Sequence, residues 1–157
     1  MEKNLKYFLP PPNEENDFQN IFRMVLISGA GRPANIDGSA ESAWTPSLLA
    51  DAISNIESNQ KGVELRTVQL WFKNNGKGIS HKNIGFLSMI LGCGDPKATS
   101  EWRLKLASTQ LKMKNEQRSK HKHELLDALN TDANKLIISK QGFSLARWTE
   151  SYFQVLH

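Results

Sequence analysis

The spacing of apolar residues constrains this chain most, because they recur three or four positions apart along nearly its whole length. No segment shows the sustained alternation of apolar and polar residues that marks a half-buried strand. Asp17 is a good N-cap for a first helix and Gly29 suits its end. The spacing therefore predicts an all-α fold, a helical bundle. The first helix would bury one face, made of Phe18, Ile21, Phe22, Val25 and Leu26.

Three further helices are predicted in the centre of the chain, at Pro46–Ile56, Leu65–Asn74 and His81–Leu91. Thr45 stands before the first of these and Ser80 before the third, as capping hydroxyls. Together the three helices have the order expected of a helix-turn-helix and the helix that follows it.

The C-terminal part of the chain also favours helix. Asp95 and Pro96 start a helix by the same cap-then-proline pattern, and helix-favouring sequence continues to about Leu129. Ser144 would cap a last segment. That segment carries four apolar residues on one stripe, Leu145, Trp148, Tyr152 and Phe153.

The length of 157 residues fits one domain with an appendage. We divide the chain into an extended lead-in (residues 1–16), a helical domain of helix-turn-helix type (17–94) and a C-terminal helical region (95–157) that packs or dimerises. Trp102 and Leu106 exceed what the core of such a small helical domain needs. We therefore expect them to join the C-terminal stripe in a helical hairpin or a dimer interface.

Composition limits the partners and the setting. The net charge of +4 and the pI of about 9.2 permit a nucleic-acid partner, but they also fit proteins that bind none. Cys93 is the only cysteine, so neither a disulfide framework nor a cysteine zinc site can form within the chain. We infer a reducing, cytoplasmic setting. No stretch approaches ~18 consecutive apolar residues, so we expect no transmembrane segment in this chain.

The segment Leu65–Asn74 combines an apolar side with a polar one, which is what a recognition helix needs. Its apolar side would fasten it to neighbouring helices as the structural core of the motif, formed by Val68, Trp71 and Phe72, and we expect Trp71 to be buried. Its polar residues are types that bond to base edges or phosphates. The candidate DNA-binding residues are these polar residues of the helix and one lysine of the linker that follows it, namely Arg66, Thr67, Gln69, Lys73 and Lys77.

This region resembles the helix-turn-helix of phage repressors, the Cro/C1-like family, over roughly Thr45 to Gly92. The resemblance implies that Leu65–Asn74 enters a DNA major groove and that the protein is a bacterial or phage transcription regulator. The residues that carry it stand in the order usual for that family, namely Leu49-Ala50, Gly62-Val63, Thr67-Val68, Trp71, Gly76 and the Ile84–Leu91 helix.

The sequence departs from that family at two points. Residues 51–61 separate the Leu-Ala pair from the Gly-Val turn, where the family has only a few residues. Glu64 stands where such proteins usually have a small capping hydroxyl. The Trp71-Phe72-Lys73-Asn74 element is also similar to homeodomains, but Asn75 and Gly76 replace the basic residues that would follow.

A second resemblance covers the stretch from Phe86 to Trp102, "FLSMILGCGDPKATSEW", through "FSLARW" at residues 143–148. These residues are similar to the N-terminal part of bacterial proteins of an RcgA type, which are described as transporters and carry their membrane segments later in the chain. The resemblance implies a short relative or a soluble piece of such a protein, with the helix-turn-helix as a cytosolic module.

Other features carry weaker signals. The stretch Lys112–Lys122 holds five cations and one carboxylate, and a solvated helix face explains it better than phosphate binding. His121 and His123 are two positions apart on a helix and point to different sides, which argues against a metal site. Cys93 has no histidine nearby in sequence. We predict no catalytic residues, no metal and no cofactor, and hence no enzyme.

Two hypotheses of function remain. The preferred one is a sequence-specific protein that binds double-stranded DNA, with its C-terminal helices packing within the chain or forming a homodimer. The alternative is a helical protein-interaction module, such as the cytosolic part of a membrane-associated protein. Salt-dependent binding to DNA belongs only to the first hypothesis.

Overall fold

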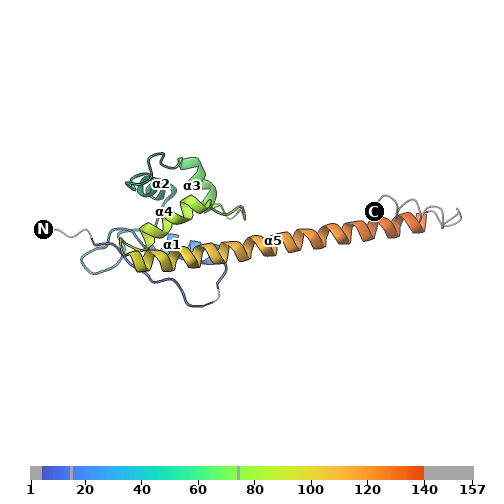
Figure 1. Cartoon of the computed structure of the whole chain (residues 1–157), viewed down its shortest axis with the longest axis horizontal. Coiled ribbons are helices and arrows are strands. Elements are labelled where there is room, and N and C mark those ends of the chain that lie inside the picture. The colour runs from blue at the N-terminus through green and yellow to red at the C-terminus, as the bar shows by residue number, and fades with distance from the viewer. Residues whose placement is uncertain (1–4, 15, 74, 140–157) are drawn as a thin grey trace. The chain divides into compact units, whose positions relative to one another are not determined.

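The computed structural model describes residues 5–14, 16–73 and 75–139. The predicted all-α class is confirmed, because these residues form five helices and no strand. The segment predicted to begin at Ser144 lies outside the described residues. The helices, labelled in Figure 1, are α1 (Phe18–Ser28), α2 (Pro46–Ser54), α3 (Leu65–Phe72), α4 (His81–Leu91) and α5 (Pro96–Ser139).

The chain divides into two compact units, residues 1–113 and 114–157. The first unit contains α1 to α4 and the part of α5 that ends at Met113. Within it, Figure 1 shows α2, α3 and α4 as one group beside α1 and the first turns of α5. The candidate DNA-binding residues all belong to this unit.

Side-chain caps start four of the helices at the predicted residues. Each cap accepts a hydrogen bond from a backbone N–H of the first turn, which has no partner inside the helix. Local sequence therefore places these helix starts. The distances between cap oxygen and backbone nitrogen are 2.7 Å for Asp17 to Asn20, 3.2 Å for Thr45 to Leu48, 3.3 Å for Ser80 to Asn83 and 3.1 Å for Asp95 to Ala98.

Helix ends differ from prediction more than helix starts. The helix α2 ends at Ser54 rather than Ile56, and α3 ends at Phe72. The helix α5 continues to Ser139 instead of ending near Leu129. No glycine or proline occurs between residues 97 and 139, so nothing in the sequence forces this helix to stop earlier.

The core of the first unit joins side chains from all five helices. Trp102 and Leu106 of α5 are 0% exposed and belong to this core, so the expectation that they form a dimer interface is wrong. Their burial follows from a helix that begins inside the compact unit. The C-terminal stripe that they would join in a hairpin lies outside the described residues. The indole nitrogen Nε1 of Trp102 also donates a hydrogen bond to the carbonyl oxygen of Leu9 at 2.9 Å, which ties the N-terminal lead-in to α5.

The lead-in is held a second time, by the loop that follows α1. Tyr7 donates its backbone N–H to the carbonyl of Arg32 at 2.7 Å and accepts from Gly31 at 2.6 Å. Gly31 has a φ of 88°, and a side chain there would approach the backbone of Ile90 in α4 to 2.9 Å. Residues 5–9 therefore form an extended strap across the first unit.

A buried glutamine joins α5 to the connection between α3 and α4. The side-chain amide of Gln110 accepts a hydrogen bond from the backbone N–H of Ile79 at 2.7 Å and donates one to the carbonyl oxygen of the same residue at 2.8 Å. Gln110 and Ile79 are both buried. One side chain thus satisfies both backbone groups of a residue that belongs to no helix.

The second unit is described here for the part of α5 from Lys114 to Ser139. Side chains 115–132 are all exposed, which confirms the exposure predicted for most of Lys112–Lys122. Exposed leucines follow that basic stretch. No helix in the described part of the chain combines the length and the apolar content needed to cross a membrane.

Replacing Gln110 by alanine should lower the free energy of unfolding by about 2–4 kcal/mol, because two buried backbone groups of Ile79 would each lose a partner. Urea denaturation of the full chain measures this change. Glu101→Ala, on the exposed side of the same helix, is the control and should stay within about 0.5 kcal/mol of the wild type. Equal losses in the two variants would mean that this pair of hydrogen bonds does not hold the fold.

Two tryptophans should differ in their contribution to stability. Trp102→Ala removes a fully buried ring and should cost about 3–5 kcal/mol. Trp71 is only partly buried, so Trp71→Ala should cost less, about 1–3 kcal/mol. Denaturant unfolding of both variants checks the order. A larger loss at Trp71 than at Trp102 would contradict the burial described here.

Candidate nucleic-acid interface

The helix α3 has one side fixed in the core. Val68 is buried there, and Trp71 and Phe72 are partly buried and pack against the core residues. The expected burial of Trp71 is therefore only partial, because its ring lines an open cavity. Val68 is the residue that anchors this helix.

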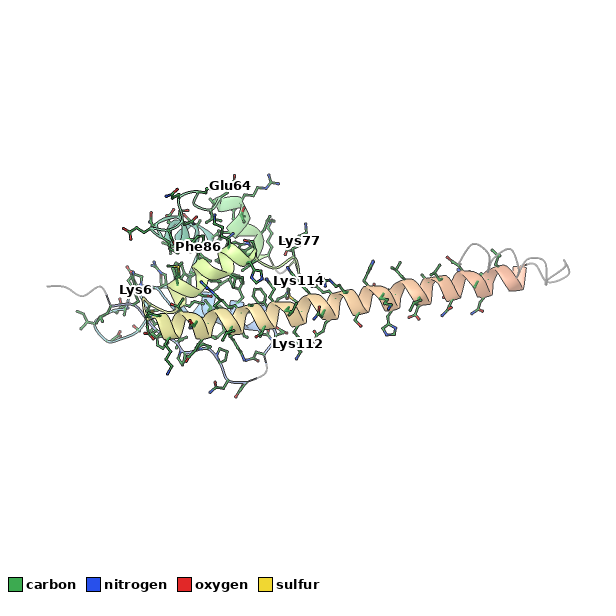
Figure 2. All side chains as sticks on the ribbon, in the orientation of Figure 1. Lys6, Glu64, Lys77, Phe86, Lys112 and Lys114 are labelled. Carbon is green, nitrogen blue, oxygen red and sulfur yellow. The ribbon has the colours of Figure 1, made fainter. Side chains whose placement is uncertain are left out.

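The other side of α3 carries the candidate DNA-binding residues. Arg66, Gln69 and Lys73 are exposed, and Thr67 is half-buried. Lys77 is exposed on the loop after the helix, where Figure 2 labels it. The structure thus places the five predicted residues on one short helix and the loop that leaves it.

Three neighbours make this face chemically mixed. Glu64, labelled in Figure 2 just before α3, is exposed, and among the described residues its carboxylate caps no amide of the helix. Leu65 and Leu70 are also exposed on α3. A phosphate backbone approaching α3 would therefore meet one carboxylate and two leucines beside the cations.

The connection between α2 and α3 is not the turn of a helix-turn-helix. That motif joins its helices by about three or four residues, whereas residues 55–64 lie between α2 and α3. The connection is held by its own bonds. Ser54 Oγ accepts from the backbone N–H of Val63 at 3.1 Å, and the Asn59 side-chain amide donates to the carbonyl of Ile53 at 3.0 Å. The helix α2 nevertheless packs against both α3 and α4.

The loop that carries Lys77 has a defined conformation. The side-chain oxygen Oδ1 of Asn75 accepts a hydrogen bond from the backbone N–H of Lys77 at 3.0 Å. Gly76 and Gly78 flank that lysine with φ angles of 72° and 76°, a region that favours glycine. Gln110 holds Ile79, two residues after Lys77, so the loop is anchored on the C-terminal side of this lysine.

An open cavity of about 370 Å³ lies on the inner side of α3. Its walls come from α1, the segment before α2, the end of α3 with the loop after it, and Met113 of α5. Phe18 stacks on Phe22 at a ring-centroid distance of 6.1 Å, and Phe22 meets Phe72 edge-on at 6.2 Å. Trp44 and Trp71 complete the aromatic wall.

Sequence reasoning missed this cavity. The sequence predicts Phe18 and Phe22 on a buried helix face, and Trp71 and Phe72 in the contacts that hold α3 to its neighbours. Trp44 precedes the predicted helix Pro46–Ile56 and belongs to no predicted helix face. Each of these rings has local spacing typical of core residues, and only long-range packing decides that they line one cavity. No local pattern in the sequence carries that information.

The residues considered for catalysis and metal binding are placed as follows. Burial raises the pKa of the Cys93 thiol, and the charge of Lys6 opposes this shift more weakly. The thiol is therefore protonated at neutral pH, the form that is a poor nucleophile. His121 and His123 are both exposed on α5. Within the described residues, no three histidine, cysteine or acidic side chains are grouped to hold a metal ion.

Comparison with known proteins identifies a family by sequence. The model of a family described as RcgA-like matches residues 4–155, which is nearly the whole chain and more than the stretch that carries the resemblance. This match gives the Cro/C1-like assignment no support. No curated protein and no solved structure matches the chain. On the family match, the chain belongs to the RcgA-like family.

Proposed function

We propose that this protein binds double-stranded DNA through the outward side of α3 and the loop after it, as a transcription regulator. One observation supports this most: Arg66, Lys73 and Lys77 are exposed together on a helix and loop whose inner side is fixed by Val68 and by Gln110. Membership of the RcgA-like family brings no function with it, so the proposal depends on this surface alone.

The charge of this segment favours a phosphate partner. Residues 61–77 contain four cations and one carboxylate, Glu64. Attraction between lysine or arginine and DNA phosphates supplies most of the non-specific affinity of DNA-binding proteins and decreases as salt is added. Lys73 and Lys77, at the end of α3 and beyond it, are the natural phosphate contacts.

Two side chains on α3 can discriminate bases. Arg66 and Gln69 are three positions apart and therefore lie on the same side of the helix. Arginine pairs well with guanine and glutamine with adenine in the major groove. The half-buried Thr67 lies between them in sequence and is restricted to a contact at the edge of this surface.

The helix α3 is supported differently from the recognition helix of a standard helix-turn-helix. The helix α2 contacts both α3 and α4, as a supporting helix should, but the long connection of residues 55–64 replaces the short turn. We therefore propose α3 as a recognition helix presented by a fold of its own. The exposed Leu65 and Leu70 would meet thymine methyl groups or sugars.

Gel shifts on genomic fragments, beginning with the DNA upstream of the protein's own gene, test this proposal at several salt concentrations. Gln69→Ala should weaken binding to the preferred fragment by about 1–3 kcal/mol and spare non-specific binding. Lys77→Ala should weaken both and reduce the slope of log affinity against log salt by about 1.

Lys97→Ala is the matched control, because it removes the same charge from an exposed position in the first turn of α5. It should leave the salt slope unchanged. The proposal fails in either of two cases. One is that no fragment binds even at low salt, and the other is that Lys97→Ala and Lys77→Ala have the same effect.

The aromatic cavity favours a second candidate function, a protein-interaction module. An open cavity of about 370 Å³ that is lined by aromatic, aliphatic and polar side chains has the size of sites that accept a side chain or a small ligand. Asp17 and Arg23 lie among its lining residues and would orient a partner. In this alternative, the cavity receives an aromatic or aliphatic side chain of another protein.

Selection of displayed peptides on the immobilised protein tests the alternative. Ile27 is exposed and lines the cavity, so Ile27→Glu should abolish binding of the selected peptides without unfolding the protein. Ile36→Glu is the control, because Ile36 is fully exposed and is not among the residues that line the cavity. Peptides that bind the two variants equally would exclude the cavity as their site.

A further inference from the structure

The helix of the second unit exposes leucines in an otherwise polar sequence. Leu125, Leu126 and Leu129 are 52%, 48% and 43% exposed, within a stretch whose side chains are all exposed from residue 115 to 132. Helices in proteins gain most of their stability from packing an apolar face, and little from intrinsic propensity. These leucines therefore mark an interaction surface on α5.

The spacing of this surface is that of a coiled coil. Successive residues of the surface are alternately three and four positions apart, as the a and d positions of a heptad are. Leucine occupies three of the five seam positions, and charged residues occupy the other two. The seam in this part of α5 consists of Lys122, Leu125, Leu129, Asp132 and Leu136.

The charges beside and within the seam change sign along the helix. Residues 112–122 hold five cations and one carboxylate, whereas residues 123–134 hold three carboxylates and no lysine or arginine. Within the seam itself, Lys122 precedes Leu125 by three positions and Asp132 follows Leu129 by three, so the two opposite charges lie at equal distances outside the two leucines. Charges at and beside such seams set both partner and orientation.

The two orientations differ sharply at the charged seam positions. A parallel pair would place Lys122 against Lys122 and Asp132 against Asp132 of the second copy. An antiparallel pair that sets Leu125 opposite Leu129 of the second copy also sets Lys122 opposite Asp132. Only the antiparallel register brings leucine to leucine and opposite charges together at once.

We propose that the part of α5 after Met113 is an antiparallel pairing surface for a second copy of this chain. Each Leu125 packs on Leu129 of the second copy, and each Lys122 pairs with Asp132 of the second copy. The proposal does not depend on DNA binding, because no residue of α3 takes part in it. A polar residue at such a seam fixes register and orientation at some expense of affinity.

Analytical ultracentrifugation of the full chain tests the pairing. The wild type should be a dimer that dissociates on dilution, and the double variant Leu125→Glu with Leu129→Glu should be a monomer. Leu104→Glu is the matched control: it makes the same change at an exposed leucine outside the paired stretch and should stay dimeric. A wild-type monomer at all concentrations, or a dimer that survives the double change, would overturn the proposal.

Charge reversal tests the orientation. Lys122→Glu should raise the dimer dissociation constant on the order of tenfold, because both copies then place two carboxylates together. Adding Asp132→Lys to the same chain should restore dimerisation. A parallel pair predicts otherwise, since the single reversal would only replace two facing lysines by two facing glutamates. An unchanged dissociation constant in the single variant would therefore overturn the antiparallel arrangement.

Cysteine cross-linking gives an independent readout in a Cys93→Ser background. A mixture of Lys122→Cys and Asp132→Cys chains should form a disulfide-linked heterodimer, because these positions face each other in the antiparallel pair. Each variant alone should stay largely unlinked under the same oxidation. Efficient linkage of Lys122→Cys to itself would show a parallel pair and refute the proposal.

Discussion

The pair of hydrogen bonds between Gln110 and the backbone of Ile79 is the interaction on which the candidate interface most depends. It joins the first half of α5 to the loop between α3 and α4, and it is buried, where a backbone group without a partner is costly. The loop it holds carries Lys77. Closer to the N-terminus of the same helix, the ring of Trp102 packs in the core and its indole N–H donates a hydrogen bond to the carbonyl of Leu9 in the lead-in. The first half of α5 thus holds two segments in place, the N-terminal lead-in and the loop between α3 and α4.

Sequence was informative where structure is decided locally. Asp17, Thr45 and Ser80 start helices because each side chain bonds to an amide three residues ahead. It was less informative where distant segments meet. Trp102 belongs to the core because α5 begins inside the compact unit, and the buried Gln110 bonds to both backbone groups of Ile79, which lies 31 positions away. Neither fact is visible in the spacing of residues along one helix. The aromatic cavity is set by long-range packing in the same way.

The two functional hypotheses use opposite sides of α3. Its outward side offers Arg66 and Gln69 to solvent, and Lys73 is exposed directly after its end. Its inner side contributes Trp71 and Phe72 to the aromatic cavity. The RcgA-like family match covers both sides and favours neither. Antiparallel pairing through α5 is compatible with either hypothesis, and in a DNA-binding protein it would supply two copies of α3, as most dimeric regulators do.

The most direct test of the DNA-binding account is a chemical-shift map of the nitrogen-15-labelled protein titrated with a bound duplex fragment at low salt. The account predicts that the backbone amides of residues 65–73 and of Lys77 shift together, while the buried indole N–H signals of Trp44 and Trp102 stay in place. Shifts confined to the indole of Trp44 and to cavity residues outside α3, or no shifts at all, would contradict it.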